Sequence, residues 1–189
     1  MILSRRRVLK WGGALAGVST VGLRSATVFG REPADGRDVG VSKRIAFLNL
    51  HTDERLDIEY FRHGAYRPEA LTAIEVLLRD FRTGERHVID PHLLDYLVDV
   101  AHSLDAEPAF SVISGYRSAR TNAGLRERSS GVAQHSLHME GRAIDVRMVH
   151  VDCAKLAAHA LNLQRGGVGY YRASDFVHLD TGPFRTWKG

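Results

Sequence analysis

Short segments in which apolar and polar residues alternate predict β-strands in the C-terminal half of the chain. The segment 143–148 (AIDVRM) places Asp145 on one face of a strand, with isoleucine, valine and methionine on the other. The segment 176–180 (FVHLD) alternates in the same way and places His178 and Asp180 on one face. If the two strands are antiparallel neighbours, Asp145 and His178 point to the same side of the sheet and can approach each other.

Three more segments have the composition of strands. Residues 44–50 and 55–61 flank the polar segment HTDE, which predicts a hairpin. Residues 108–116 form a largely apolar run that is typical of a buried strand. Ser118 follows this strand, and we expect its side chain to cap a short helix.

Apolar residues at helical spacing predict three longer helices. The first begins at Pro68, and its apolar stripe consists of Leu71, Ile74, Leu78 and Phe81. The second begins at Pro91 behind Asp90, a residue type that favours the N-cap position. The third, rich in alanine, covers 151–163 and is expected to end at Gly166-Gly167. Together the elements indicate an α+β fold, with a small antiparallel sheet and helices packed on one side of it.

His138, Asp145 and His178 carry the most specific chemistry in the chain. Two imidazoles and one carboxylate make three ligands of the kind that zinc accepts. Gly141 lies between His138 and the strand that carries Asp145, and glycine allows the chain to turn tightly back there. The seven-residue step from His138 to Asp145 also fits two turns of a helix, but the glycine and the β-branched residues favour a loop followed by a strand.

Three protein ligands leave one position on a zinc ion for water, whereas a structural zinc site usually has four protein ligands. Zinc lowers the pKa of such a water toward neutrality, which is the chemistry of a hydrolase. The alternative is that these histidines are ordinary surface or hydrogen-bonded residues, as most of the ten histidines are expected to be. The ordered pattern favours the metal site, and His135, which adjoins it, is expected to be exposed.

Composition indicates one soluble domain preceded by a basic segment. The chain has 189 residues, 44% of them hydrophobic, and a formal net charge of +4. Five of its 26 basic residues lie in the first 26 residues, which contain no acid, so the remainder has 21 basic against 22 acidic residues. The basic charge therefore does not indicate a nucleic-acid partner. Cys153 is the only cysteine, which excludes an internal disulfide, and we expect it to be a packed residue.

The first 30 residues have the features of an export signal. Residues 4–10 (SRRRVLK) resemble the twin-arginine consensus, and the moderately apolar segment 11–23 follows them. That segment is too short and too weakly apolar to predict a stable membrane span in the mature protein. Residues 31–43 are polar and predict a linker, so that 44–189 is the expected domain with the zinc site and the twin-arginine machinery an expected partner.

The run Ser136-x-His138-x-x-Gly141-x-Ala143-x-Asp145, followed by a strand with His178, resembles the zinc D-alanyl-D-alanine peptidase family, which shares a fold with the hedgehog signalling domain. Within that family the chain most resembles the murein endopeptidase K group of exported bacterial proteins. The resemblance extends from about residue 44 to residue 187. It implies a hedgehog-like peptidase fold, a Zn²⁺ cofactor, peptidoglycan peptide stems as substrate and a periplasmic location.

The resemblance also implies roles for residues beside the ligands. Arg117 matches the family arginine that points at the substrate carbonyl or its oxyanion, and its alternative role is an ordinary salt bridge. Asp175 stands where related branches place the general base, although it could equally be an exposed loop acid. Some members carry a second histidine at the position of Phe176, and this chain departs from them there.

Residue chemistry suggests three further contributions. Asp180 shares a strand face with His178 and could orient that ligand by a hydrogen bond. Ser136 could bind substrate or fix the loop before His138. Three tyrosines are expected to form walls of the site: Tyr116, Tyr170 and Tyr171.

We therefore predict an exported zinc metallopeptidase that cuts peptide crosslinks in peptidoglycan. One alternative is a D,D-carboxypeptidase or dipeptidase that removes a terminal residue. Another is a zinc-stabilised module that binds the cell wall without catalysis, since a fold by itself does not establish an activity. The sequence does not distinguish D,D from L,D crosslinks.

Overall fold

A computed structural model describes residues 40–128 and 131–189, which lie in the compact unit Asp38–Gly189. The expected export signal and residues 31–39 of the expected linker lie outside the described residues. The first strand begins at Lys43, one residue before the expected start of the domain. Within the described part of the chain, no helix is long and apolar enough to cross a membrane.

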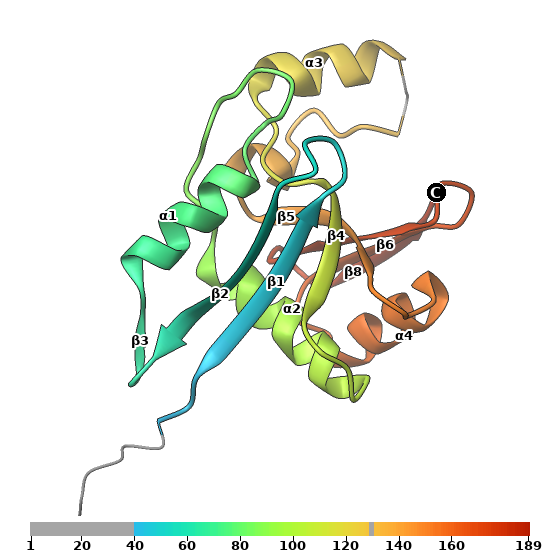
Figure 1. Ribbon diagram of the computed structural model, residues 1–189. Helices are drawn as coiled ribbons and strands as arrows, with labels where there is room; N and C mark the ends of the chain where they lie inside the picture. Colours follow the sequence, from blue (N-terminus) through green and yellow to red (C-terminus); the bar gives the residue numbers. More distant parts are fainter. Residues whose placement is uncertain (1–39, 129–130) are drawn as a thin grey trace, which may run out of the picture. The chain divides into compact units, whose positions relative to one another are not determined.

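One eight-stranded sheet forms the centre of the molecule (Figure 1). Its strands are β1 (Lys43–Asn49), β2 (Arg55–Arg62), β3 (Ala65–Tyr66), β4 (Ala109–Ser114), β5 (Ala143–Met148), β6 (Gly167–Tyr171), β7 (Phe176–Asp180) and β8 (Arg185–Lys188). They lie in the order β3-β2-β1-β4-β5-β7-β6-β8. The predicted hairpin of β1 and β2 and the antiparallel pairing of β5 with β7 are confirmed.

The sheet is mixed and larger than the small antiparallel sheet that the sequence suggested, although the α+β class is confirmed. β1 pairs with β4 in parallel, and so does β6 with β8. The helices α1 (Pro68–Leu77) and α2 (Pro91–Ser103) lie between β1 and β4 in the chain, and a connection of this length allows two strands to run in the same direction. The alternation within each strand does not encode this pairing.

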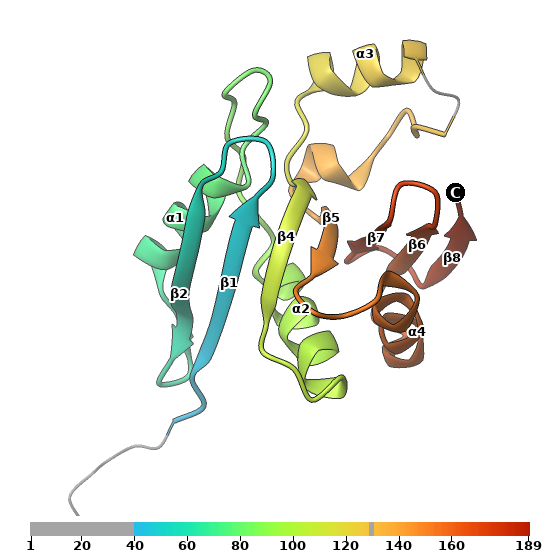
Figure 2. The same ribbon diagram turned by 45° about the vertical axis from the view of Figure 1, so that its right-hand side comes forward.

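Three helices, α1, α2 and α4 (Cys153–Leu163), pack on one face of the sheet and bury its apolar side chains (Figure 2). The core includes Ile45, Phe110, Ile144 and Val177 from strands and Ile74, Leu94 and Leu156 from helices. Helix α3 (Ala119–Arg128) instead lies beyond the C-terminal end of β4. The opposite face of the central strands is therefore left for polar side chains.

The helix starts are confirmed more closely than the helix ends. The Asp90 carboxylate accepts the His92 N–H at 3.0 Å, and the Ser118 hydroxyl accepts the Thr121 N–H at 3.2 Å, as capping residues do. Helix α1 stops at Leu77, so that Phe81 lies in the following turn and not on the helix.

The prediction that Gly166-Gly167 closes the third long helix is wrong. Gln164 takes the left-handed conformation at the end of α4, with φ of 51°. Gly167 is the first residue of β6, where a side chain would overlap the carboxylate of Asp180. These glycines therefore provide close packing between strands, which sequence spacing does not distinguish from a helix cap.

Candidate metal centre

One row of residues across the sheet assembles most of the candidate site. Ser114 pairs with Asp145, Asp145 with His178, His178 with Gly169, and Gly169 with Trp187. Because paired residues on neighbouring strands point to the same face, this row projects away from the helices. Gly169 has no side chain, and the Trp187 indole occupies the space above it, 5.1 Å from the His178 ring centre. The register thus places Asp145 and His178 side by side, with the Trp187 indole packed next to His178.

His138 reaches the row from a short 3₁₀ helix, Leu137–Glu140, that precedes β5. Gly141 ends this turn with φ of 66°, and a side chain at this position would overlap the backbone oxygen of Val88. The turn brings the fully buried His138 ring back over the sheet, where its Nδ1 lies 2.7 Å from the Gly115 carbonyl. The expectation of a tight turn at Gly141 followed by a strand is confirmed.

Three ligand atoms converge at the centre of the site. His138 Nε2 lies 3.2 Å from both Asp145 Oδ1 and His178 Nδ1, and His178 Nδ1 lies 2.9 Å from Asp145 Oδ1. A zinc ion about 2.0–2.2 Å from each of three tetrahedral ligands separates them by roughly 3.3–3.6 Å. The triangle is slightly smaller than this, and a small outward shift of the side chains would give it the dimensions that a zinc ion requires.

Hydrogen bonding on the far side of each ring explains why a cation fits here. The Gly115 carbonyl can only accept, so His138 Nδ1 carries the proton and its Nε2 lone pair faces the centre. Asp180 Oδ2 lies 2.9 Å from His178 Nε2, which leaves the Nδ1 lone pair of His178 facing the centre too. Two lone pairs and a carboxylate oxygen thus meet with no hydrogen between them, an arrangement that a metal cation stabilises.

Burial and charge shift the titration of these ligands. Burial lowers the pKa of His138, which favours the neutral, metal-binding imidazole. Burial alone would also lower the pKa of His178, but the neighbouring carboxylates of Asp145 and Asp180 raise it. For Asp145, burial is outweighed by the two histidines, which hold its pKa well below its usual range. The carboxylate is therefore ionised at neutral pH, as a metal ligand must be.

Asp180 holds the His178 ring by accepting a hydrogen bond from its Nε2. Its carboxylate is fully buried and accepts hydrogen bonds from both terminal nitrogens of Arg185, at 3.0 and 2.7 Å. The backbone N–H groups of Gly167 and Gly182 donate to it as well, at 3.0 and 2.8 Å. With every lone pair direction occupied, Asp180 fixes the orientation of the His178 ring and is not free to carry protons.

Arg117 lies on the other side of the ligand triangle. Its terminal nitrogen donates to Asp145 Oδ2 at 3.3 Å, so the guanidinium contacts the oxygen that faces away from the imidazoles. The side chain is 10% exposed, and burial lowers its pKa. Its Nε is buried without a partner within the described residues. A buried guanidinium beside a ligand can stabilise negative charge that develops on a substrate oxygen.

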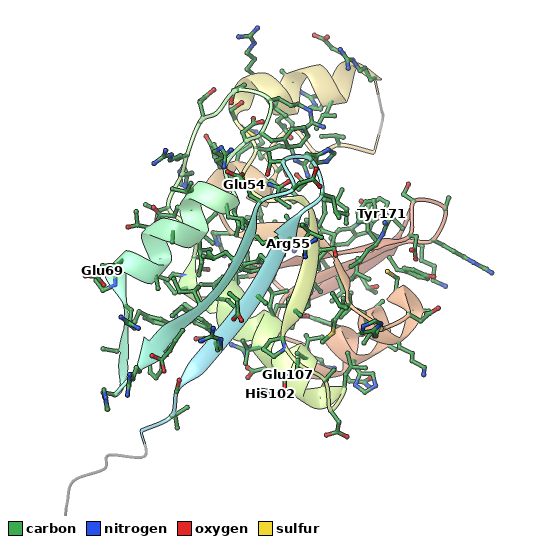
Figure 3. All side chains as sticks on the ribbon, viewed as in Figure 1. Glu54, Arg55, Glu69, His102, Glu107 and Tyr171 are labelled. Carbon is green, nitrogen blue, oxygen red and sulfur yellow. The ribbon has the colours of Figure 1, made fainter. Side chains whose placement is uncertain are left out.

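A cleft of about 520 Å³ extends from the ligand triangle in both directions across the sheet. At the β1 end it is lined by His51 and Arg82, and at the β8 end by Tyr171 and Trp187. The Trp187 ring nitrogen donates to the Tyr171 hydroxyl at 2.9 Å, so the two residues form one wall. Tyr171, the last residue of β6, lies far from His102 at the end of α2 in Figure 3.

Asp175, the expected general base, is not among the residues that line the cleft. Asp175 lies in the turn between β6 and β7 with φ of 51°, and its side chain is 68% exposed. Its carboxylate lies 3.5 Å from the guanidinium of Arg147. The exposed, ion-paired position agrees with the alternative expectation that Asp175 is a loop acid.

The other expected site residues divide into two groups. Ser136 lines the cleft, and its hydroxyl makes no capping bond to the 3₁₀ helix, so it is available to substrate. Of the three tyrosines only Tyr171 lines the cleft, whereas Tyr116 stacks on His87 outside it. Cys153 is buried, and burial raises the pKa of its thiol to about 12, as befits a packed residue.

Sequence reasoning missed Arg82, Arg185 and Trp187. Arg185 and Trp187 lie on a four-residue strand whose parallel pairing with β6 was not foreseen. Arg82 lies in the turn after α1, directly after Phe81, the last residue of the predicted apolar stripe. The alternation of Arg185 and Trp187 across Thr186 is a weak strand signal that could have placed both residues on one face.

Comparisons with known proteins agree with this geometry. The sequence profile of a peptidase family described as "Peptidoglycan L,D-endopeptidase MepK" matches residues 38–187. A Haemophilus influenzae protein named "Probable peptidoglycan L,D-endopeptidase MepK" is 44% identical over 146 residues, which cover 77% of this chain and 78% of the relative. The Escherichia coli K12 protein named "Peptidoglycan L,D-endopeptidase MepK" is 36% identical over 185 residues, 97% of each chain. No solved structure matches the chain.

Proposed function

The chain belongs to the peptidoglycan L,D-endopeptidase MepK family, and from this premise we propose that it is a zinc peptidase that hydrolyses L,D crosslinks between peptide stems. Family membership makes it a peptidoglycan endopeptidase that acts outside the cytoplasm. The L,D preference comes from the names of its relatives, and the choice of zinc comes from the two imidazoles and one carboxylate of the ligand triangle.

The observation that carries the proposal is the position of the ligand triangle within the cleft. Asp145 and His178 lie on β5 and β7, near the middle of the sheet, and the cleft continues past them toward β1 and toward β8. An enzyme that cuts an internal amide must hold peptide on both sides of the scissile bond. A cleft that extends on both sides of the metal centre supports this, whereas removal of a terminal residue calls for a site that is closed on one side.

The described side chains divide the work of hydrolysis. His138, Asp145 and His178 would hold the metal, which when bound supplies Lewis acidity and a water that is activated near neutral pH. Asp180 keeps the His178 Nδ1 lone pair directed at the centre by accepting from Nε2. Arg117 would stabilise the negative charge on the carbonyl oxygen under attack, at a position where water is largely excluded. Ser136 would contact the substrate backbone along the cleft.

Defined muropeptide dimers test this proposal. The purified domain 44–189, loaded with zinc, is incubated with one dimer joined by an L,D crosslink and one joined by a D,D crosslink, and the products are identified by mass. We expect the L,D dimer to give two monomers and chelation to abolish the reaction. Cleavage of the D,D dimer alone would overturn the crosslink assignment, and release of only terminal residues would indicate a carboxypeptidase.

We also propose that residues 1–30 direct export through the twin-arginine machinery and that 31–43 is a linker. The support is the sequence SRRRVLK at residues 4–10 and the polar composition of the segment that follows. An extracytoplasmic substrate requires some route of export, and this signal supplies one.

A further inference from the structure

We propose that Arg82 is a specificity-determining residue that binds a free carboxylate of the peptide stem next to the scissile amide. The inference deepens the proposed function and rests on it for the identity of the substrate. No expected site residue accounts for Arg82, and it lies at the β1 end of the cleft, away from the aromatic wall of Tyr171 and Trp187.

Stacking fixes the position of the Arg82 side chain. Its guanidinium lies over the ring of Phe81, with 4.1 Å between the central carbon and the ring centre. Phe81 stacks in turn on the ring of His51, with 3.8 Å between centres and 15° between planes. A guanidinium that lies over a ring can still offer N–H groups at its edge, and this edge is the part that binds a carboxylate. The stack thus reduces the entropy lost when Arg82 binds a ligand.

The turn that carries Arg82 is fixed to the metal centre by one buried carboxylate. Asp80 is 1% exposed, and its Oδ1 accepts the Arg82 N–H at 3.0 Å. Its Oδ2 accepts the N–H and the hydroxyl of Ser118, at 2.9 and 2.7 Å, directly after Arg117 in the chain. The Tyr116 N–H also donates to the Leu78 carbonyl at 2.8 Å. These hydrogen bonds therefore fix the backbone position of Arg82 relative to that of Arg117.

Arg82, an exposed residue, is the arginine of the cleft that has no carboxylate partner in the described part of the chain. Among the described residues, three arginines line the cleft, and the only carboxylate in the lining is Asp145. Arg117 pairs with Asp145 and Arg185 with Asp180, whereas no ion pair joins Arg82 to a carboxylate in residues 40–128 or 131–189. An uncompensated guanidinium in a substrate cleft attracts an anionic group. Peptide stems offer carboxylates, and a guanidinium edge binds these with two parallel hydrogen bonds.

Two synthetic dimers test the inference. They differ only in the free carboxylate next to the scissile amide, which is a carboxamide in the second dimer. The values of kcat/KM are measured for wild type, Arg82→Gln, Arg82→Lys and Arg86→Gln, the last being a matched control because Arg86 is an exposed residue of the same turn outside the cleft. Calorimetric binding of both dimers to the same four metal-free proteins repeats the comparison without turnover.

We expect wild type and Arg86→Gln to prefer the carboxylate dimer by roughly 10- to 100-fold, the range that a hydrogen bond to a charged group gives. Arg82→Gln should lose this preference, because its kcat/KM falls for the carboxylate dimer and stays unchanged for the carboxamide dimer. Arg82→Lys should keep part of the preference. An unchanged preference in Arg82→Gln, or no preference in wild type in either assay, would overturn the inference. Binding with the expected preference but no cleavage by wild type would contradict the proposed function and leave the carboxylate site standing.

Discussion

Replacement of Asp180 by asparagine should weaken metal binding without removing a ligand. The substitution keeps the size of the side chain but exchanges one acceptor oxygen for an NH₂ donor. If this NH₂ faces His178 Nε2, the imidazole must accept there and carry its proton on Nδ1, where the metal should bind. If it faces the other way, it meets three donors, the N–H groups of Gly167 and Gly182 and one nitrogen of Arg185.

The expected size of this effect follows from the hydrogen bonds that Asp180 makes. Loss of a carboxylate that orients a metal-bound histidine typically reduces metal affinity about 10- to 100-fold, or roughly 1.4–2.7 kcal/mol. The ion pair with Arg185 is lost as well, and because Asp180 is fully buried its replacement leaves donors without a partner. We therefore expect a lower free energy of unfolding, by about 1–3 kcal/mol, in addition to the weaker metal binding.

Competition with a chromogenic chelator measures the zinc Kd of wild type, Asp180→Asn and the control Asp57→Asn, whose carboxylate is 60% exposed on β2. Asp180→Asn should bind one zinc per chain with a Kd raised about 10- to 100-fold, and it should regain most turnover at saturating zinc. A Kd equal to that of wild type would refute the view that Asp180 selects the His178 tautomer.

Three further perturbations test the roles of other residues. Arg117→Ala should lower kcat by about 10²–10³-fold with zinc retained. Asp175→Ala should change kcat less than about threefold, because the Asp175 side chain is solvated. Steady-state kinetics on an L,D dimer compares the two variants. Burial alone would raise the pKa of Asp80, but hydrogen bonds lower it from 3.8 to about 2. The ionised carboxylate therefore adds about 2 kcal/mol to the free energy of unfolding above pH 4, and this contribution is lost as the pH falls through 2. In urea unfolding, Asp80→Asn should therefore approach wild type in stability at low pH. Replacing Arg5 and Arg6 by lysine should leave the precursor in the cytoplasm, which cell fractionation detects.

The ligands could be predicted from sequence because their geometry is local. Strand alternation fixed the faces of Asp145 and His178, and a single glycine indicated how His138 turns back toward them. The same reasoning applies to Asp180, which lies two residues from His178 on one strand face. Each of these inferences needed only the period of one strand or the conformational freedom of one residue.

The remainder of the site depends on pairings between distant segments. Trp187 covers His178 only because β8 joins the sheet beside β6, and no local pattern encodes that neighbour. The stack of Arg82 on Phe81 requires α1 to end early, where the buried Asp80 organises the turn. The expectation for Asp175 rests on the family resemblance, and the structure places its exposed side chain outside the residues that line the cleft.

Metal content and crosslink cleavage, measured together for His138→Ala and for His102→Ala, test the central claim most directly. His102 lies at the end of α2, exposed and far from Tyr171 in Figure 3, so its loss controls for the removal of a histidine. Wild type and His102→Ala should hold one zinc per chain and cleave the L,D dimer, whereas His138→Ala should lose both properties, because three ligands leave no redundancy. A His138→Ala variant that keeps full zinc content and full turnover would contradict the assignment of this site.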